Sequence, residues 1–189
     1  MIDVAVKLCL EQGYERTTVD QIAAEADVSP RTFSRYFATK DAVYMALIED
    51  LVEAAGAELR RIPPEVPVLQ ALRDAHVAVL RRIDSDGGHD ITDAHVARML
   101  KVINSTPELK RAAAELEPTA IGDALAERLG MRTDDRRLRL ARGVWTAIIV
   151  TGCGDLVAPE NGRELGPGLM ADRIMGSFAD FAEMTAALR

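Results

Sequence analysis

The chain has 189 residues, of which 48% are hydrophobic and 28% charged, and its formal net charge is -7. This composition is typical of a folded globular protein and excludes an intrinsically disordered chain. The longest apolar run, 144–153, is about half of the roughly 20 residues that span a bilayer, and Met1 leads straight into a helical pattern without a signal peptide. We therefore expect one or two small domains in the cytoplasm.

The first expected helix covers residues 2–12 and has an apolar stripe on one side. Gly13 supplies its C-terminal stop. The helix is expected to pack over the two short helices that follow it. The two cysteines, Cys9 and Cys153, show no metal-ligand spacing, so we expect both to be buried as small hydrophobic residues.

Two short helices joined by a tight turn are expected between residues 17 and 40. Thr18 and Gln21 have the spacing of a capping box at the start of the first helix. Ser29 can cap the second helix, and Pro30 falls in its first turn, where a missing N–H costs nothing. This arrangement is typical of a helix-turn-helix.

The second short helix carries side chains suited to DNA. Phe33, Tyr36 and Phe37 are expected on one side, while the segment from Arg31 to Lys40 holds three basic residues and no acidic one. Arginine donates bidentately to guanine or phosphate, and hydroxyls reach phosphates or base edges, so a local basic patch can bind DNA despite the acidic body. The candidate DNA-binding residues are Thr18, Ser29, Arg31, Thr32, Arg35, Tyr36 and Lys40.

Residues 14–47 resemble the DNA-binding domain of the TetR family of transcriptional regulators. The matching pattern is Gly13-Tyr14, Thr17-Thr18-Val19-x-x-Ile22-Ala23, Val28-Ser29, Thr32-Phe33-x-Arg35-Tyr36-Phe37 and Lys40. The resemblance implies a dimer in which the second short helix of each subunit is the recognition helix that reads DNA. It also implies an effector that moves the fourth helix of the chain and so changes the separation of the two recognition helices. Family members commonly carry a basic arm before the first helix. The sequence has none, so such contacts are missing or the true start lies upstream.

A long helix capped by Thr39 is expected to run to Ile62, before Pro63-Pro64. We place the domain boundary inside it, which gives a helix-turn-helix domain over 1–45 and a helical effector-binding and dimerisation domain over 46–189. Pro118 is expected to kink or divide one of the later helices. These later helices are expected over 68–83, 92–103, 106–129, 134–157 and 169–188. The predicted fold class is all-α, with about nine helices.

The last two expected helices predict a homodimer. The helix over 134–157 is apolar nearly all round, so it must be buried on more than one side. Two helices from each subunit would form a symmetric four-helix contact, and two recognition helices would multiply specificity on a palindromic operator. The alternative is that both helices belong to a monomeric core.

An all-helical second domain can also house a ligand cavity between its helices. The candidate effector-pocket residues are His76, Met99, Ile103, Trp145 and Ile149, each equally explained by core packing. An apolar pocket would suit a hydrophobic effector. Arg98 or Lys101 could pair with an acidic head group, although on a helix both are more often solvated.

A metal site and an enzyme are the less favoured interpretations. His89, Asp90, Asp93 and His95 are possible ligands for Zn or Ni, but their spacing matches no strong signature and a solvated loop is expected. The chain contains no hydrolase, P-loop, dinucleotide or metalloprotease motif, and Cys153 has no histidine close in sequence. We therefore expect no catalysis, no metal and no cofactor.

Together these patterns indicate a ligand-responsive dimeric transcriptional regulator, with repression as the favoured output. It would bind a palindromic operator and be released from it by a small hydrophobic effector in the C-terminal domain. The alternative is a helical homodimeric interaction protein without specific DNA binding, in which residues 17–40 serve only for packing. A gel shift separates the two hypotheses.

Overall fold

The structure, a computed structural model, describes residues 1–85 and 91–186, and these residues form ten α-helices and no strand longer than an isolated bridge. The all-α class is therefore confirmed. In chain order the helices are α1 (Ile2–Gln12), α2 (Val19–Glu25), α3 (Pro30–Tyr36), α4 (Lys40–Arg61), α5 (Val68–Ser85), α6 (Asp93–Ile103), α7 (Pro107–Glu115), α8 (Thr119–Leu129), α9 (Arg136–Cys153) and α10 (Pro167–Thr185).

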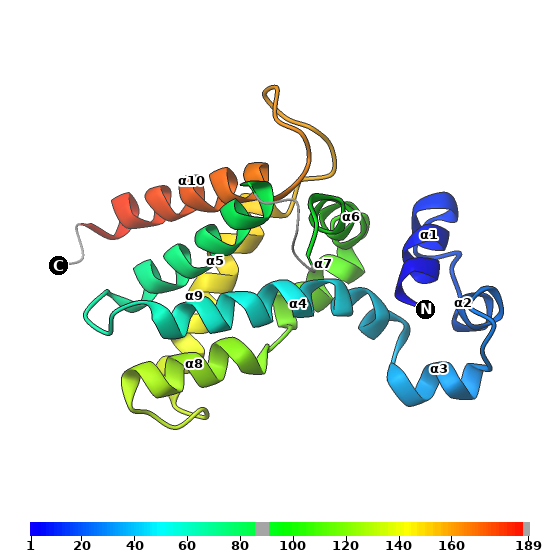
Figure 1. Cartoon of the computed structure of the whole chain (residues 1–189), viewed down its shortest axis with the longest axis horizontal. Helices are drawn as coiled ribbons and strands as arrows, with labels where there is room; N and C mark the ends of the chain where they lie inside the picture. The colour runs from blue at the N-terminus through cyan, green and yellow to red at the C-terminus, as the bar shows by residue number, and fades with distance from the viewer. Residues whose placement is uncertain (86–90, 187–189) are drawn as a thin grey trace.

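The helices fall into a small head and a larger body. Helices α1 to α3 form the head at one end of the molecule, and α4 runs from it into the body (Figure 1). In the body, α4 packs against α5 and α8, and α10 packs against α5 and α9. The long helix thus joins the two parts as the sequence predicts, while the domain boundary at residue 45 stays a prediction.

The helix starts in the head are fixed by the caps that the sequence predicts. The Thr18 side chain accepts a hydrogen bond from the Gln21 N–H at 3.2 Å, and the Gln21 side chain accepts one from the Thr18 N–H at 3.0 Å. Ser29 caps α3 and Thr39 caps α4 in the same way. Each such cap contributes about 1 kcal/mol, so the helix-turn-helix is specified by local chemistry.

The core of the head forms around Phe33, which is buried together with Ala5 and Ile22. The Phe33 ring packs on Phe37 with ring centroids 5.4 Å apart. Tyr36 does not join this buried core, because its side chain is 62% exposed. Of the three aromatic residues that the sequence places on one side of α3, Phe33 and Phe37 pack in the head, and Tyr36 stays outside the buried core.

Proline divides the helix expected over residues 106–129. Helix α7 ends at Glu115 and α8 begins at Thr119, with Pro118 at the N-cap of α8. A proline at that point has no N–H to donate and clashes with the preceding turn, so a single helix cannot continue through it. The sequence predicts that Pro118 either kinks or divides this helix, and the structure shows division. The described residues therefore form ten helices where about nine were expected.

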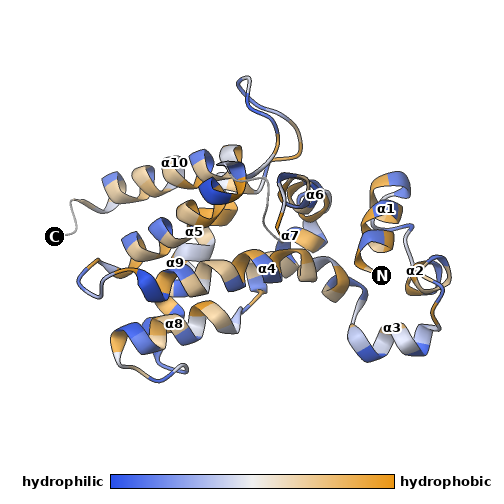
Figure 2. Cartoon of the chain, viewed as in Figure 1, coloured by the Kyte–Doolittle hydropathy of each residue, from blue (hydrophilic) through white to orange (hydrophobic). Residues whose placement is uncertain are grey.

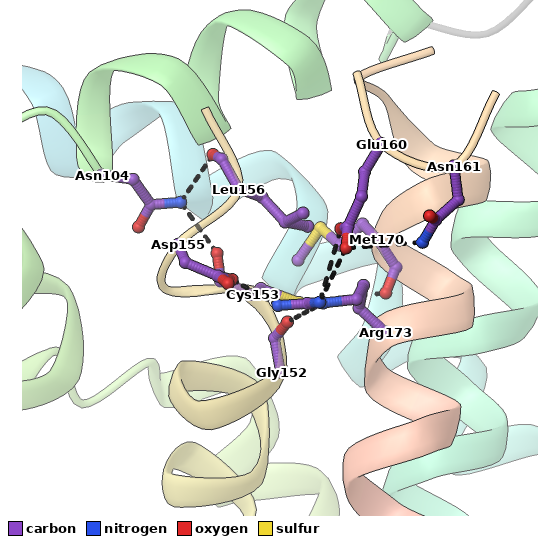
Figure 3. A network of polar contacts seen from close by, with 9 residues as sticks. All are labelled: Asn104, Gly152, Cys153, Asp155, Leu156, Glu160, Asn161, Met170 and Arg173. Atoms are coloured by element: carbon purple, nitrogen blue, oxygen red, sulfur yellow. Dashed lines mark hydrogen bonds and ion pairs between the residues drawn. The ribbon is translucent and has the colours of Figure 1, made fainter. Parts of the chain in front are cut away.

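Helix α9 ends at Cys153, four residues before the expected end near Val157. Its last carbonyl groups accept hydrogen bonds from side chains of other helices (Figure 3). Arg173 of α10 donates to the Gly152 carbonyl at 2.7 Å, and Asn104, at the end of α6, donates to the Cys153 carbonyl at 2.8 Å. These long-range partners terminate the helix, and a sequence pattern cannot reveal them.

The two cysteines lie where the sequence predicts. Cys9 and Cys153 are both buried and free, which confirms their interpretation as small hydrophobic residues. In the part of the chain that the structure describes, none of the helices combines the length and the apolar character needed to cross a membrane.

Candidate nucleic-acid interface and ligand cavity

The exposed side of α3 is the candidate interface for nucleic acid. Arg31, Arg35 and Tyr36 are all exposed on this helix, which Figure 2 shows as mostly hydrophilic. The Arg35 guanidinium lies 4.9 Å from the centre of the Tyr36 ring and donates to the Tyr36 hydroxyl at 3.3 Å. A cation held on an aromatic ring keeps its remaining donors turned outward, where phosphate or guanine can accept from them.

The hydroxyl groups among the DNA-binding candidates already serve the protein. The Ser29 side chain accepts from the Thr32 N–H at 3.1 Å, and its oxygen lies 2.9 Å from the Thr32 hydroxyl. Thr18 caps α2 from the turn before it. Ser29 and Thr18 are exposed and Thr32 partly so, which leaves room for DNA contacts, and such contacts stay predictions.

Lys40 has a structural role that the sequence does not indicate. Its ammonium group donates to the Tyr14 carbonyl at 3.0 Å and to the Thr17 carbonyl at 3.1 Å. It also lies 3.7 Å from the centre of the Tyr14 ring. These hydrogen bonds of Lys40 therefore link the turn before α2 to the start of α4. Two of its three N–H donors are used within the head, and a DNA contact through the third stays a prediction.

The body contains a cavity of about 550 Å³ among helices α4 to α10. This volume lies within the range of roughly 300–1,000 Å³ that small-molecule sites occupy. All five residues predicted to line an effector pocket contact this one cavity; they are His76, Met99, Ile103, Trp145 and Ile149. The structure thus brings the five together, and their role in binding an effector stays a prediction.

A buried histidine and the only tryptophan of the chain form part of the cavity wall. His76 places its Nδ1 atom 2.8 Å from the Leu72 carbonyl, and the Trp145 indole donates to His76 Nε2 at 3.4 Å. These partners assign the proton of a neutral imidazole to Nδ1. Burial lowers the pKa of His76 to about 4, so this wall carries no charge at neutral pH.

The charged residues at the cavity are not those suggested by the sequence. Arg98 and Lys101 do not line it, and Arg98 instead lies 3.2 Å from the Asp3 carboxylate of α1. The basic residues that line the cavity are Lys110, Arg139 and Arg142, and the acidic ones are Glu115 and Glu117. The helical phase of α9 places its arginines here, and a sequence pattern cannot fix that phase when the helix is apolar on several sides.

Helix α6 joins the cavity to the head. Its residues Met99 and Ile103 line the cavity, while His95 places Nε2 2.9 Å from the Leu47 carbonyl of α4. The Arg98–Asp3 ion pair adds a contact with α1. A change in the cavity that shifts α6 would therefore reach the head through these contacts.

The candidate metal ligands that the structure describes, Asp93 and His95, form no cluster with other candidate ligands among the described residues. His95 is engaged with the backbone of α4, and no group of three or more candidate ligands occurs among residues 1–85 and 91–186. Two of the four candidates, His89 and Asp90, lie outside the described residues.

Comparison with known proteins agrees with this architecture. Residues 1–47 match the sequence model of the family described as "Bacterial regulatory proteins, tetR family". The chain is 37% identical over 139 residues to the HTH-type transcriptional regulator TcmR of Streptomyces glaucescens, an alignment that covers 71% of this chain and 61% of TcmR. It is 38% identical over 61 residues to the HTH-type transcriptional regulator HbdR of Aromatoleum sp. (strain CIB), covering 32% of this chain and 27% of HbdR.

A solved structure shows the same fold over nearly the whole chain. Thermus thermophilus FadR, a TetR family transcriptional repressor crystallised in complex with lauroyl-CoA, superposes with a TM-score of 0.50 at 23% identity, covering 94% of this chain and 89% of that chain. The chain spans less than two thirds of the length of TcmR and HbdR. The family-model match and the helix-turn-helix formed by α1 to α3 agree that residues 1–47 of this chain are similar to the TetR family of bacterial regulatory proteins.

Proposed function

We propose that the chain is a dimeric, ligand-responsive transcriptional regulator that represses its target genes. The observation that carries this proposal is the pairing of two sites in one chain. The head presents α3 with Arg31, Arg35 and Tyr36 exposed, and the body holds a cavity of about 550 Å³. The relatives named above are transcriptional regulators, which supports a DNA-binding role.

The proposed dimer forms through α9 and α10. Both helices expose apolar side chains, namely Leu140 and Val150 on α9 and Met175 on α10. A monomer leaves these groups in water, whereas a symmetric contact of two helices from each subunit would bury them. Two heads in one dimer would place two copies of α3 on successive turns of a palindromic operator.

The proposed effector acts through α6. This helix lines the cavity on one side and contacts α1 and α4 on another. An effector that binds more tightly to the dimer whose heads are wrongly spaced for DNA would weaken DNA binding. The largest possible loss of DNA affinity equals the ratio of the effector's affinities for the two spacings. By the same linkage, DNA would weaken effector binding by the same factor.

The test begins with DNA. Footprinting on the region upstream of its own coding sequence and gel shifts with genomic fragments are expected to reveal a protected palindrome, and small molecules are then screened for release of that complex. If no fragment is bound tightly, the chain is a helical interaction protein rather than a regulator. If DNA is bound and no cavity ligand changes its affinity, the regulatory part of the proposal fails.

A further inference from the structure

The cavity lining contains an apolar part and a charged part. Helices α4 and α6 contribute apolar side chains, among them Leu51, Met99 and Ile103. The charged groups come from α7, from the connection between α7 and α8, and from the first half of α9. A ligand that fills this space would meet both hydrocarbon and ionic groups.

Arg142 is a largely buried residue of the charged part of this lining. Its side chain is only 17% exposed. Within residues 1–85 and 91–186 its guanidinium donates no hydrogen bond, and the one carboxylate within 4 Å is that of Glu117, at 3.7 Å. A guanidinium has five N–H donors, and desolvating them without acceptors is unfavourable. Arg142 thus presents partly buried donors, with no hydrogen-bond acceptor among the described residues, beside a cavity large enough for a ligand.

The neighbouring arginine differs from Arg142 in this respect. Arg139 also lines the cavity, but its side chain lies largely in solvent and donates to the Asp134 carbonyl at 3.2 Å. Arg139, Arg142 and Glu117 also border a smaller adjoining recess of about 370 Å³. A polar group bound at Arg142 would therefore have room to extend beyond the apolar cavity.

The acidic residues of the wall do not neutralise Arg142 firmly. Glu117 is 74% exposed, and ion pairs of such exposed groups contribute little. Glu115, the other acidic residue of the lining, is also exposed and has no ion pair with Arg142. An anion carried by a ligand can therefore replace Glu117 at the guanidinium, and Glu117 would compete with that anion.

We propose that the cavity binds an anionic amphiphile. Its apolar body would lie among Met99, Ile103 and Trp145, and its acidic group would pair with the Arg142 guanidinium in place of Glu117. The proposal rests on the proposed function, because it names the chemical class of the effector of the same cavity. The sequence suggests Arg98 or Lys101 as the partner of an acidic head group, and the proposal replaces both with Arg142, which lines the cavity.

Two fluorescent probes with one aromatic skeleton test the charge requirement. N-phenyl-1-naphthylamine is neutral, and 8-anilinonaphthalene-1-sulfonate carries an added sulfonate. Trp145 is the only tryptophan of the chain and lines the cavity, so energy transfer from Trp145 is strongest for probe bound there and reports on its binding. The dissociation constant of each probe is measured by titration with the full chain in the absence of DNA.

The expected result is a change in the preference for the sulfonate. Arg142→Gln should weaken sulfonate binding by about tenfold or more, because a charge-assisted hydrogen bond is lost, and leave the neutral probe within about twofold. Glu117→Gln should strengthen sulfonate binding several-fold, because it removes the competing carboxylate. Arg98→Gln, at an arginine outside the cavity lining, is the matched control and should change neither constant.

The proposal is overturned if Arg142→Gln changes both probes equally, or if no energy transfer from Trp145 to the sulfonate probe occurs. Should Arg142→Gln fail to fold, as judged by circular dichroism, Glu117→Gln decides alone, and an unchanged sulfonate constant then overturns the proposal. The proposed function is tested separately. Sulfonate binding through Arg142 without any specific DNA binding would contradict the regulator, whereas DNA binding with no sulfonate preference would contradict only the ligand class.

Discussion

The head and the body place their candidate sites in opposite kinds of environment. In the head, Arg31, Arg35 and Tyr36 project from the surface of a two-turn helix whose ends are fixed by caps a few residues away. In the body, His76, Arg142 and Trp145 come from different parts of two helices and meet only because the bundle packs as it does. A surface site of the first kind follows from local sequence, whereas a cavity depends on tertiary packing.

The largest expected effect tests the head. The double substitution Arg31→Ala and Arg35→Ala should weaken binding to a selected DNA fragment by about a hundredfold or more, because each arginine that contacts a base or phosphate contributes about 1–3 kcal/mol. Fluorescence anisotropy with labelled DNA measures the change, and thermal unfolding should stay unaltered because both side chains are exposed.

The matched control for this pair is Arg81→Ala with Arg111→Ala, two exposed arginines of the body. It alters the net charge by the same amount and should leave DNA affinity within about threefold. Equal losses in the two double variants would mean that only the overall charge matters, and α3 would no longer be the interface.

The second effect tests the packing of the body. A Cβ atom added at Gly152 would lie 2.8 Å from the Arg173 carbonyl and 3.0 Å from the Ser177 hydroxyl, so Gly152→Ala should force α9 and α10 apart and lower the free energy of unfolding by up to about 3 kcal/mol. Urea unfolding measures the loss. Gly176→Ala, where an added Cβ meets nothing within 4 Å, should not destabilise the protein. Similar losses at both positions would remove close helix contact as the cause.

The third effect tests the neutral histidine of the cavity wall. Burial lowers the pKa of His76 to about 4, below its ordinary value near 6.5, so the unfolded chain binds more protons than the folded one between these two values. Stability is therefore lost as the pH falls through this window, by about 2 kcal/mol between pH 7 and pH 5.

His76→Gln should remove this part of the pH dependence, and His95→Gln, at a partly exposed histidine, should retain it. Urea unfolding of the three proteins at pH 7 and pH 5 makes the comparison. The burial argument fails if the slope of stability against pH is the same in His76→Gln as in the unaltered chain.

The smallest effect tests the caps of the head. Ser29→Ala removes the oxygen that accepts from the Thr32 N–H and should lower the free energy of unfolding by about 1 kcal/mol. Ser34→Ala, at an exposed position within α3, is the control and should change stability by less than about 0.5 kcal/mol. A loss of DNA affinity in Ser29→Ala beyond that explained by unfolding would support a direct contact, and equal stability of the two variants would rule out the cap.

The difference between head and body also explains what the sequence could predict. The caps at Thr18, Ser29 and Thr39 depend on partners three residues away, so their spacing is visible in the sequence. The five cavity residues were identifiable as apolar or aromatic positions on the inner sides of helices. Their meeting in one cavity was not, because the sequence does not fix how those helices pack.

The features that the sequence missed all depend on distant partners. Lys40 matches the family pattern, yet its ammonium group bonds to carbonyls more than twenty residues away. Helix α9 ends early because Asn104 and Arg173 hold its last carbonyls, as Figure 3 shows. Arg142 lies in a helix whose apolar pattern hides which side faces the cavity. In each case the deciding contact is tertiary.

Selection of bound fragments from random double-stranded DNA by the full chain tests the central claim most directly. The account predicts enrichment of a palindrome whose half-sites are separated by about one or more helical turns, and loss of that enrichment in the Arg31→Ala and Arg35→Ala double variant. A final pool in which no sequence is enriched over the starting DNA would contradict the account, whatever ligand the cavity binds.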